Sequence, residues 1–319
     1  MFKTELCDLL GIQYPILQGG MVWVSYNELC AAVSNSGGLG ILAGGSMTAD
    51  ELREEIRLVK EKTDKPFGAN IPVVKPDSES LVNVAIEEEV DIISTSAGNP
   101  KRFTQKIHDA GLKVIHVSPS PQLAAKAAEA GVDAIVAEGI EAGGHDGFEE
   151  ITTMALVPQV VETVDIPVIA AGGIADFRGF VAALSLGAKG VQIGTRFAAT
   201  REAQGHPDFK KAIIDAGPTG TAITGRGFGP TRSVRNRLTD QILEMERRGA
   251  GLEELLKMIG TGRSRRATQD GDVEEGTIYC GQIAGMIREL KSVEEVFTEI
   301  IEGAEVLINE LGKVSTASR

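Results

Sequence analysis

The sequence predicts an α/β protein in which eight parallel strands and their helices form a (β/α)8 TIM barrel, with a small, mainly helical second domain over the barrel mouth. Short apolar runs alternate with longer amphipathic stretches, which is typical of repeated βαβ units. Eight such runs occur by residue 194, the number that a barrel of this kind needs. Glycine is frequent (38 of 319 residues) and aromatic residues make up only 4%, which suits many tight strand-to-helix turns.

The eight predicted strands are short, apolar and bounded by turn residues, as expected for strands that are buried on both faces. In chain order they are 15–18 (PILQ), 39–43 (LGILA), 67–71 (FGANI), 91–95 (DIIST), 113–117 (KVIHV), 133–137 (DAIVA), 167–171 (PVIAA) and 190–194 (GVQIG). Apolar residues at helical spacing predict helices between them, for example over 49–63 and 120–131. A doubly wound open sheet is the alternative, but such sheets usually stop at five or six strands.

The alternating pattern breaks after residue 205. Residues 217–238 are rich in Gly, Thr and Arg, and residues 252–276 begin with a helical pattern and become loop-like. We therefore assign 206–285 to the small domain, which would act as a substrate or lid domain. Residues 1–205 and 286–319 would form the barrel, because 293–311 reads as an amphipathic helix that returns to it.

Composition narrows the classes of function. The net charge of −13 argues against nucleic-acid binding. No apolar stretch approaches the ~18 residues of a membrane helix, and the first residues do not resemble a signal peptide. The three cysteines form no C-x-x-C pair and the four histidines have no close ligand spacing, so neither disulfides nor a metal site is expected. We expect a cytoplasmic protein that binds neither membranes nor nucleic acid.

Two glycine-containing loops are candidates for a phosphate site. Active sites of these barrels lie at the carboxyl ends of the strands, and the last two strands often hold a phosphate there. Gly172 and Gly173 follow the seventh predicted strand, and Gly194 and Thr195 end the eighth. Their backbone N–H groups could approach phosphate oxygens. These glycines could instead merely end strands, but two such pairs after consecutive strands favour phosphate binding.

The stretch EAGGHDGF, residues 141–148, provides the candidate catalytic residue. His145 should lie on the catalytic face of the barrel, where an imidazole is a general acid–base candidate. The surrounding glycines are interpreted as clearance for a flat ligand. Glu138, at the end of the sixth predicted strand, is expected to orient a ligand as a hydrogen-bond acceptor.

Eight motifs in order resemble a known family. They are YPILQGGMVWV, AVSNSGGLGIL, KPFGANI, AGNP, AEGIEAGGHDG, IPVIAAGGIAD, GVQIGTRF and GQIAGMI, and they span nearly the whole chain. They are similar to the flavin-dependent enoyl-[acyl-carrier-protein] reductases of the FabK type, in a superfamily shared with the nitronate monooxygenases, once called 2-nitropropane dioxygenases. TTMALVPQVV and GDVEEGTIYCGQIAGMI favour the reductase branch.

This resemblance implies a barrel that holds FMN non-covalently, with NADH or NADPH as co-substrate. By motif, Gly20 and Met21 would contact the isoalloxazine ring and Asn70 its polar edge. Glu138 and Gly144 would line the flavin. The flavin phosphate would lie at the four residues already named, namely Gly172, Gly173, Gly194 and Thr195. His145 matches the family's catalytic histidine.

The implied reaction is NAD(P)H-driven reduction of trans-2-enoyl thioesters in fatty-acid synthesis, with enoyl-acyl carrier protein or enoyl-CoA as substrate and a homodimer as the expected assembly. Nitronate monooxygenase and NAD(P)H:quinone reductase activity on the same flavin barrel remain alternatives. Between residues 226 and 266, ten basic residues stand against five acidic ones. Such a patch, which includes Arg232 and Arg235, could steer an acidic carrier protein, or its arginines could pair with the acidic barrel or with a subunit interface.

Overall fold

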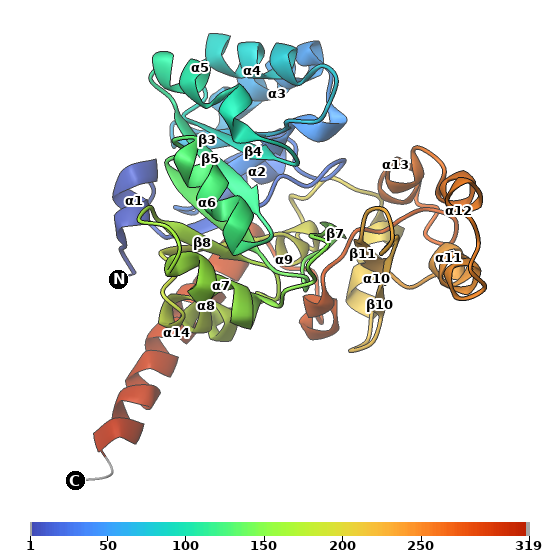
Figure 1. Ribbon diagram of the computed structural model, residues 1–319. Helices are drawn as coiled ribbons and strands as arrows, with labels where there is room; N and C mark the ends of the chain where they lie inside the picture. Colours follow the sequence, from blue (N-terminus) through green and yellow to red (C-terminus); the bar gives the residue numbers. More distant parts are fainter. Residues whose placement is uncertain (1, 317–319) are drawn as a thin grey trace.

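The computed structural model describes residues 2–316, and its centre is an eight-stranded parallel barrel (Figure 1). The strands are β1 (Ile16–Gln18), β2 (Gly40–Ala43), β3 (Phe67–Pro72), β4 (Ile92–Ser96), β5 (Lys113–Ser118), β6 (Ala134–Glu138), β8 (Val168–Ala171) and β9 (Gly190–Ile193). Their order is β1-β9-β8-β6-β5-β4-β3-β2. A parallel bridge between Leu17 and Leu39 closes the circle, and Gln18 N–H donates to the Leu39 carbonyl at 3.0 Å. The predicted barrel is confirmed, with every strand boundary within one residue of the expected position.

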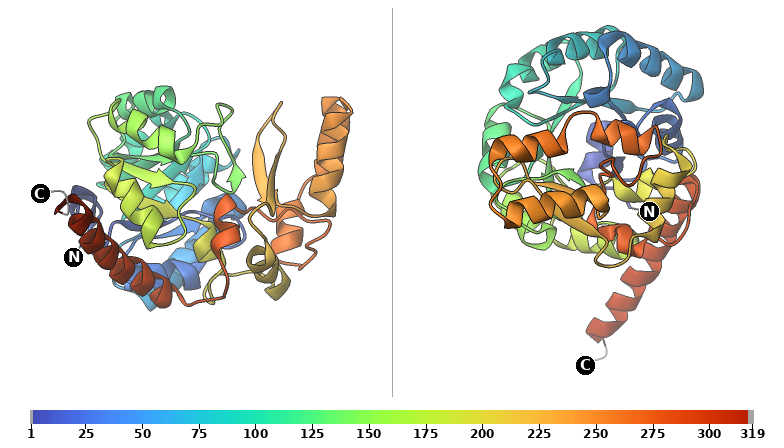
Figure 2. Two further views of the ribbon diagram at one scale, coloured as in Figure 1. Left: turned by 90° about the horizontal axis from the view of Figure 1, so that it is seen from below. Right: turned by 90° about the vertical axis from the view of Figure 1, so that its right-hand side faces the viewer.

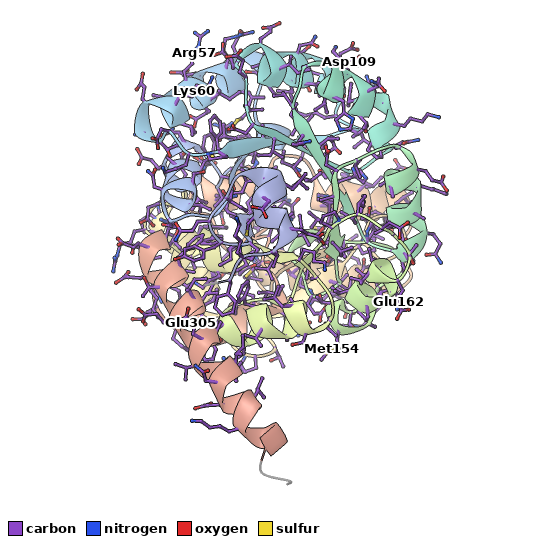
Figure 3. The ribbon with its side chains drawn as sticks, turned by 90° about the vertical axis from the view of Figure 1, so that its left-hand side faces the viewer. Arg57, Lys60, Asp109, Met154, Glu162 and Glu305 are labelled. Atoms are coloured by element: carbon purple, nitrogen blue, oxygen red, sulfur yellow. The ribbon has the colours of Figure 1, made fainter. Side chains whose placement is uncertain are left out.

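Helices surround the barrel and follow the strands along the chain. They are α2 (Asn27–Asn35), α3 (Ala49–Lys62), α4 (Ser78–Glu87), α5 (Thr104–Asp109), α6 (Pro121–Glu129), α7 (Thr153–Val161), α8 (Phe177–Ser185), α9 (Thr195–Ala198) and α14 (Val293–Thr316), with short 3-10 turns η1 (Gly44–Ser46) and η2 (Pro100–Arg102). A capping box between Thr48 and Glu51 fixes the start of α3. Figure 3 shows Arg57, Lys60 and Glu162 pointing outward from this outer layer. Only the first part of α14 packs on the barrel, and its end projects from the body (Figure 1).

Apolar side chains fill the inside of the barrel, so that it is a core and not a channel. Leu17, Ile41, Ile115 and Ile169 are fully buried there. At the amino-terminal end of the strands, helix α1 (Glu5–Leu10) adds its buried residues to the same cluster. The bottom of the barrel is therefore closed, and the carboxyl ends of the strands are left for the site.

The segment over the barrel mouth is small and mainly helical, as predicted, but it also contains a sheet that the sequence analysis missed. Its elements are α10 (Pro207–Asp215), β10 (Thr221–Thr224), β11 (Thr231–Val234), α11 (Arg237–Arg247), α12 (Leu252–Ile259), α13 (Arg263–Thr268) and η3 (Gln282–Met286). The two-residue strand β7 (Gly144–His145) leaves the barrel and pairs with β11. Figure 2 shows these elements gathered on one side of the barrel.

The small segment has its own apolar core and is hydrogen-bonded to a loop of the barrel. Leu238, Ile242 and Leu255 form a separate buried cluster. Gln269 Nε2 donates to the carbonyl of Trp23 in the loop after β1, at 2.7 Å. The exact division at residues 206 and 285 stays a prediction.

Three further observations concern membrane-spanning helices, disulfide bonds and metal sites. No helix within residues 2–316 has the length and apolar character that crossing a bilayer requires. Cys7, Cys30 and Cys280 are buried and unpaired. In the described part of the chain, no cluster of three His, Cys, Asp or Glu side chains is arranged to hold a metal ion.

Candidate active site

The loops after β1 and β3 meet at the barrel mouth because one of them carries no side chain. A Cβ atom placed on Gly20 would lie 2.4 Å from the Cβ of Asn70, so only glycine fits. Asn70 is fixed in turn by a hydrogen bond from its Nδ2 to Ser94 Oγ at 3.2 Å. The next residue, Met21, reaches the loop after β9: its Sδ lies 3.7 Å from the Cβ position of Gly194. Four predicted site residues are thus brought together from the ends of three strands: Gly20 and Met21 after β1, Asn70 in β3 and Gly194 after β9.

The loop after β8 has the conformation of an anion cradle. Gly172 and Gly173 both have positive φ angles, 87° and 73°, which a residue with a side chain rarely adopts. The N–H groups of Gly173 and Ile174 have no hydrogen-bond acceptor among the described residues. Consecutive backbone N–H groups in such a turn form a concave site for phosphate oxygens. The conformation fits the predicted phosphate site.

The other half of the predicted phosphate site is tied to the small segment. Thr195 begins α9, and its Oγ1 accepts a hydrogen bond from Gly281 N–H at 2.9 Å. A Cβ on Gly281 would lie 2.7 Å from the Glu141 carbonyl oxygen. Gly281 therefore contacts the loop after β6 through the Glu141 backbone and the segment after β9 through the Thr195 hydroxyl.

Glu141 is a site residue that the sequence analysis did not identify. Thr153 donates to its Oε2 twice, from the backbone N–H at 2.6 Å and from Oγ1 at 2.8 Å. Its Oε1 lies 3.4 Å from the Cβ position of Gly173. Glu141 thus fixes its loop to the start of α7 beside the phosphate cradle. No local pattern signals this role, because the partner lies twelve residues away across a loop.

His145 lies in β7, where it pairs with Thr231 of β11. Its ring packs on Tyr279 with centroids 5.5 Å apart. The residue is partly open to solvent, yet the protein atoms packed around the imidazole lower its pKa by desolvation. His145 is therefore neutral at neutral pH, with one N–H available as a hydrogen-bond donor.

The glycines around His145 serve contacts within the protein. A Cβ on Gly143 would lie 2.5 Å from the carbonyl carbon of Cys280, and one on Gly147 would lie 2.4 Å from the Cβ of Pro119. Gly144 has a φ of 95°. The interpretation of all three as clearance for a flat ligand was wrong for Gly143 and Gly147, which admit other segments of this chain.

Two carboxyl groups of the site are strongly perturbed. Burial raises the pKa of Glu138 to about 7. Burial, and then the nearby charge of Glu138, raise the pKa of Asp146 to about 8, while Arg232 opposes the shift. Such values concentrate at functional sites. Asp146 was present in the quoted motif but was not selected, because nothing in a sequence shows that a carboxyl group is buried.

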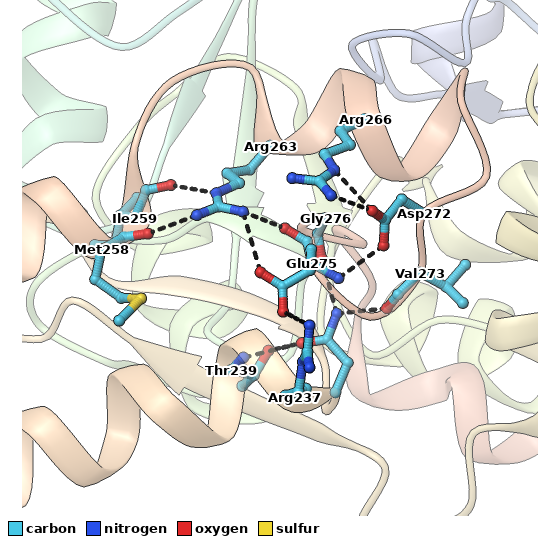
Figure 4. Close-up of polar contacts among 11 residues, drawn as sticks. Arg237, Thr239, Met258, Ile259, Arg263, Arg266, Asp272, Val273, Glu275 and Gly276 are labelled. Atoms are coloured by element: carbon cyan, nitrogen blue, oxygen red, sulfur yellow. Dashed lines mark hydrogen bonds and ion pairs between the residues drawn. The ribbon is translucent and has the colours of Figure 1, made fainter.

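The basic patch proposed from residue counts is largely neutralised. Arg237 and Arg263 both pair with Glu275, and Arg266 pairs with Asp272 (Figure 4). Other ion pairs in the same segment are Arg226–Glu150, Arg235–Asp240 and Arg247–Glu244. Arg232 is 6% exposed and donates from Nε to the Ile140 carbonyl at 3.0 Å. Arg232 was wrongly placed on a docking surface. Pairing with the barrel, as the alternative expected, is seen for Arg226, whereas the other paired arginines have partners within the small segment itself.

Replacing Gly173 by valine should weaken FMN binding by about tenfold or more while the barrel still folds. The positive φ at this position costs a β-branched residue roughly 1–2 kcal/mol, which is enough to change the cradle. Flavin content and an FMN titration by fluorescence measure the effect. Gly249→Val is the matched control, because Gly249 also has a positive φ (74°) but nothing lies within 4 Å of its Cβ position. Equal FMN binding in both variants would show that the turn at Gly173 only ends a strand.

Comparisons with known proteins agree with this geometry. A family model described as nitronate monooxygenase matches residues 3–303. The structure of FabK from Thermotoga maritima is 43% identical in sequence, with a TM-score of 0.94 over 98% of this chain and 100% of that one.

Two curated relatives match over nearly their whole lengths. The (3aS,4S,5R,7aS)-5-hydroxy-7a-methyl-1-oxo-octahydro-1H-indene-4-carboxyl-CoA dehydrogenase of Mycobacterium tuberculosis is 35% identical, over 94% of this chain and 95% of that protein. A probable nitronate monooxygenase of Staphylococcus saprophyticus is 30% identical, over 96% of this chain and 99% of that protein. The chain therefore belongs to the nitronate monooxygenase family and is an FMN-dependent oxidoreductase.

Proposed function

We propose that the protein reduces trans-2-enoyl thioesters with NADH or NADPH, as enoyl-[acyl-carrier-protein] reductases of the FabK type do. The observation that carries the proposal is the 43% identity and TM-score of 0.94 to FabK along essentially the full chain. A 35% identical relative is named as a carboxyl-CoA dehydrogenase, so a second branch of the family also handles an acyl thioester.

The barrel mouth fits FMN. The unpaired N–H groups of Gly173 and Ile174 would hold its phosphate together with Gly194 and Thr195. Gly20, Met21, Asn70, Glu138 and Gly144 would line the ring, as the resemblance implies. Bound FMN would supply hydride transfer between the nicotinamide and the substrate, and the protein supplies positioning and electrostatics.

His145 would act on the thioester carbonyl. A neutral imidazole donates a hydrogen bond to an oxygen without giving up its proton. Such a bond stabilises the negative charge that grows on the carbonyl oxygen when hydride adds to the β-carbon. Tyr279 packs on the ring and restrains its orientation.

Nitronate monooxygenase activity is the alternative, because the family model and a 30% identical relative carry that name. An anaerobic experiment separates the two. The protein is reduced with NADH, and crotonyl-CoA, an enoyl-carrier protein, a nitronate and a quinone are then offered separately while flavin reoxidation is followed. We expect fast reoxidation by the enoyl thioesters. Inertness toward every enoyl thioester, with fast turnover of nitronate once O₂ is admitted, would replace the proposal by the alternative.

His145→Ala should retain FMN and still be reduced by NAD(P)H, but should reoxidise with enoyl thioester about 10²–10⁴-fold more slowly. The two half-reactions differ because only the second builds charge on the thioester. Stopped-flow absorbance of the flavin measures both. His108→Ala is the control, since His108 lies on α5 and bonds to Asp133 at 2.9 Å, outside the site. Unchanged reoxidation in His145→Ala would leave His145 a structural residue.

Docking of an acyl carrier protein is testable at Arg248 and Lys257, two exposed basic residues of the stretch 226–266 that form no ion pair within the described part of the chain. A third such residue, Arg265, lies over the ring of Trp23. Charge reversal at Arg248 and Lys257 should raise the apparent KM for enoyl-carrier protein and leave that for a small enoyl thioester unchanged, because rim charges act on association with a charged partner. Arg235→Glu is the contrasting variant, since Arg235 already pairs with Asp240. Equal KM values for all variants would indicate that the substrate is the CoA thioester. The homodimer and the cytoplasmic location stay predictions.

A further inference from the structure

Trp23, in the loop after β1, has a backbone conformation that a bulky residue rarely adopts. Its φ angle is 65°, and within residues 2–316 it is the one aromatic residue with a positive φ. Such an outlier persists only where surrounding contacts hold it, and outliers of this kind cluster at functional sites. Trp23 N–H donates to Ser46 Oγ at 3.1 Å, and the Trp23 carbonyl accepts from Gln269 Nε2 at 2.7 Å. The barrel and the small segment therefore hold this conformation together.

A tight turn places Trp23 next to a residue that is expected to contact the flavin ring. Val24 N–H and Ser25 N–H both donate to the Met21 carbonyl, at 3.1 and 2.9 Å. Met21 N–H donates in turn to Ser25 Oγ at 2.9 Å. The indole is two residues from Met21 in a turn that is hydrogen-bonded to itself, so it belongs to the rim of the barrel mouth.

Helix α13 spans the mouth above this rim. The guanidinium carbon of Arg265 lies 5.8 Å from the centroid of the Trp23 ring. The preceding residue, Ser264, lies beside the hydroxyl of Tyr279, whose ring packs on His145. These two contacts are with loops that follow β1 and β6, and β8 and β9 separate those strands in the barrel. Arg265 is therefore held at the mouth of the site.

The guanidinium of Arg265 is exposed and makes no ion pair or hydrogen bond with the described residues. Glu51 and Glu55 of α3 are acidic groups on this side of the mouth, since both act, as Arg265 does, on the hydroxyl of Tyr26. Glu51 is occupied in the capping box of its own helix, and Glu55 accepts two hydrogen bonds from Asn27, at 2.7 and 2.8 Å. A cation over an aromatic face keeps its N–H groups available for another acceptor.

Arg265 differs in position from the other basic residues of its stretch. Its neighbours Arg263 and Arg266 are neutralised by carboxylates of the small segment (Figure 4). The two other exposed residues that form no ion pair in the described chain, Arg248 and Lys257, belong to the end of α11 and to α12, which lie farther from the barrel than α13 (Figure 1). Arg265 thus supplies a positive charge at the mouth itself.

We propose that Arg265, supported by the indole of Trp23, binds the diphosphate of a substrate that contains adenosine diphosphate. The proposal rests on the proposed function, because NADH, NADPH and coenzyme A thioesters all carry this group and all must bring their reacting end to the flavin. A planar guanidinium can donate two parallel hydrogen bonds to phosphate oxygens. Trp23 is a positioning residue, because its ring fixes where the guanidinium lies.

The two sources of the diphosphate differ in reach. A ribose separates it from the reacting ring in the dinucleotides, whereas the long pantetheine arm separates it from the thioester in coenzyme A. One fixed arginine cannot suit both lengths equally, so the experiment has an arm for each source.

The chain contains one tryptophan, so its intrinsic fluorescence reports on this place alone. ADP-ribose and coenzyme A are titrated separately into the FMN-loaded protein, with excitation at the red edge of tryptophan absorption, where adenine does not absorb. At least one of them should change the emission saturably. Arg265→Gln should weaken its binding by about tenfold, as expected for the loss of an exposed charged hydrogen-bonded contact. Lys126→Gln is the control, because it removes an exposed charge from the outer helix α6.

Stopped-flow kinetics separate the two sources. Arg265→Gln should raise the apparent Kd of NADH in flavin reduction if the dinucleotide uses the site, or that of crotonyl-CoA in flavin reoxidation if the thioester does. The limiting rates should stay unchanged, as should the apparent Kd of crotonyl-N-acetylcysteamine, which has no phosphate. Trp23→Phe keeps an aromatic face and should behave as wild type, whereas Trp23→Ala should raise the same Kd as Arg265→Gln.

Equal affinity of the wild-type protein and Arg265→Gln for both ADP-ribose and coenzyme A overturns the inference, and so does the absence of binding by fluorescence and calorimetry. The contact with Trp23 would then only tie α13 to the barrel. FMN content and Tm are measured in each variant to show that the fold is intact. If the wild-type protein reduces no enoyl thioester, the proposed function fails, and the ADP-ribose titration still decides whether Arg265 binds a diphosphate.

Discussion

The site depends on how tightly the loop after β6 is held between the barrel and residues 280–282. A Cβ on Gly139 would lie 2.2 Å from Thr153 Oγ1, and one on Gly143 would lie 2.5 Å from the Cys280 carbonyl carbon. Gln282 N–H closes the contact by donating to the Glu141 carbonyl at 2.9 Å. Glycine is required at both close approaches, because any side chain would separate the surfaces. This arrangement fixes His145, Asp146 and the phosphate cradle relative to one another.

The sequence predicted the barrel well because each strand carries its own signal. A run such as DAIVA is short, apolar and bounded by turns, and its burial on both faces follows from the parallel sheet. The three-stranded sheet of β10, β11 and β7 carried no comparable signal. TAIT is half polar, TRSV has a single apolar residue, and the two residues of β7 have partners that lie 86 and 88 positions away. Pairing over that distance is decided by tertiary structure, which a local pattern does not contain.

The sequence could suggest candidate residues for the site but not its electrostatics. Glycines after strands pointed to the phosphate cradle, and the positive φ angles of Gly172 and Gly173 agree with that interpretation. Counting charges over 226–266 gave an excess of arginine and suggested a docking surface. The count could not show that Arg232 is buried, or that Glu275 and Asp272 outside the counted range neutralise three of the others.

The arrangement of charge bears on which substrate the barrel would serve. Reduction of an enoyl thioester needs a hydrogen-bond donor for the carbonyl oxygen and a proton for the α-carbon, and these are different chemical demands. Under the proposed function, a neutral His145 would meet the first. Oxidation of a nitronate anion needs neither an added proton at carbon nor an acid kept beside the flavin. Asp146, whose two carboxyl oxygens are enclosed without a hydrogen-bond partner among the described residues, would retain its proton at neutral pH, because burial raises its pKa to about 8.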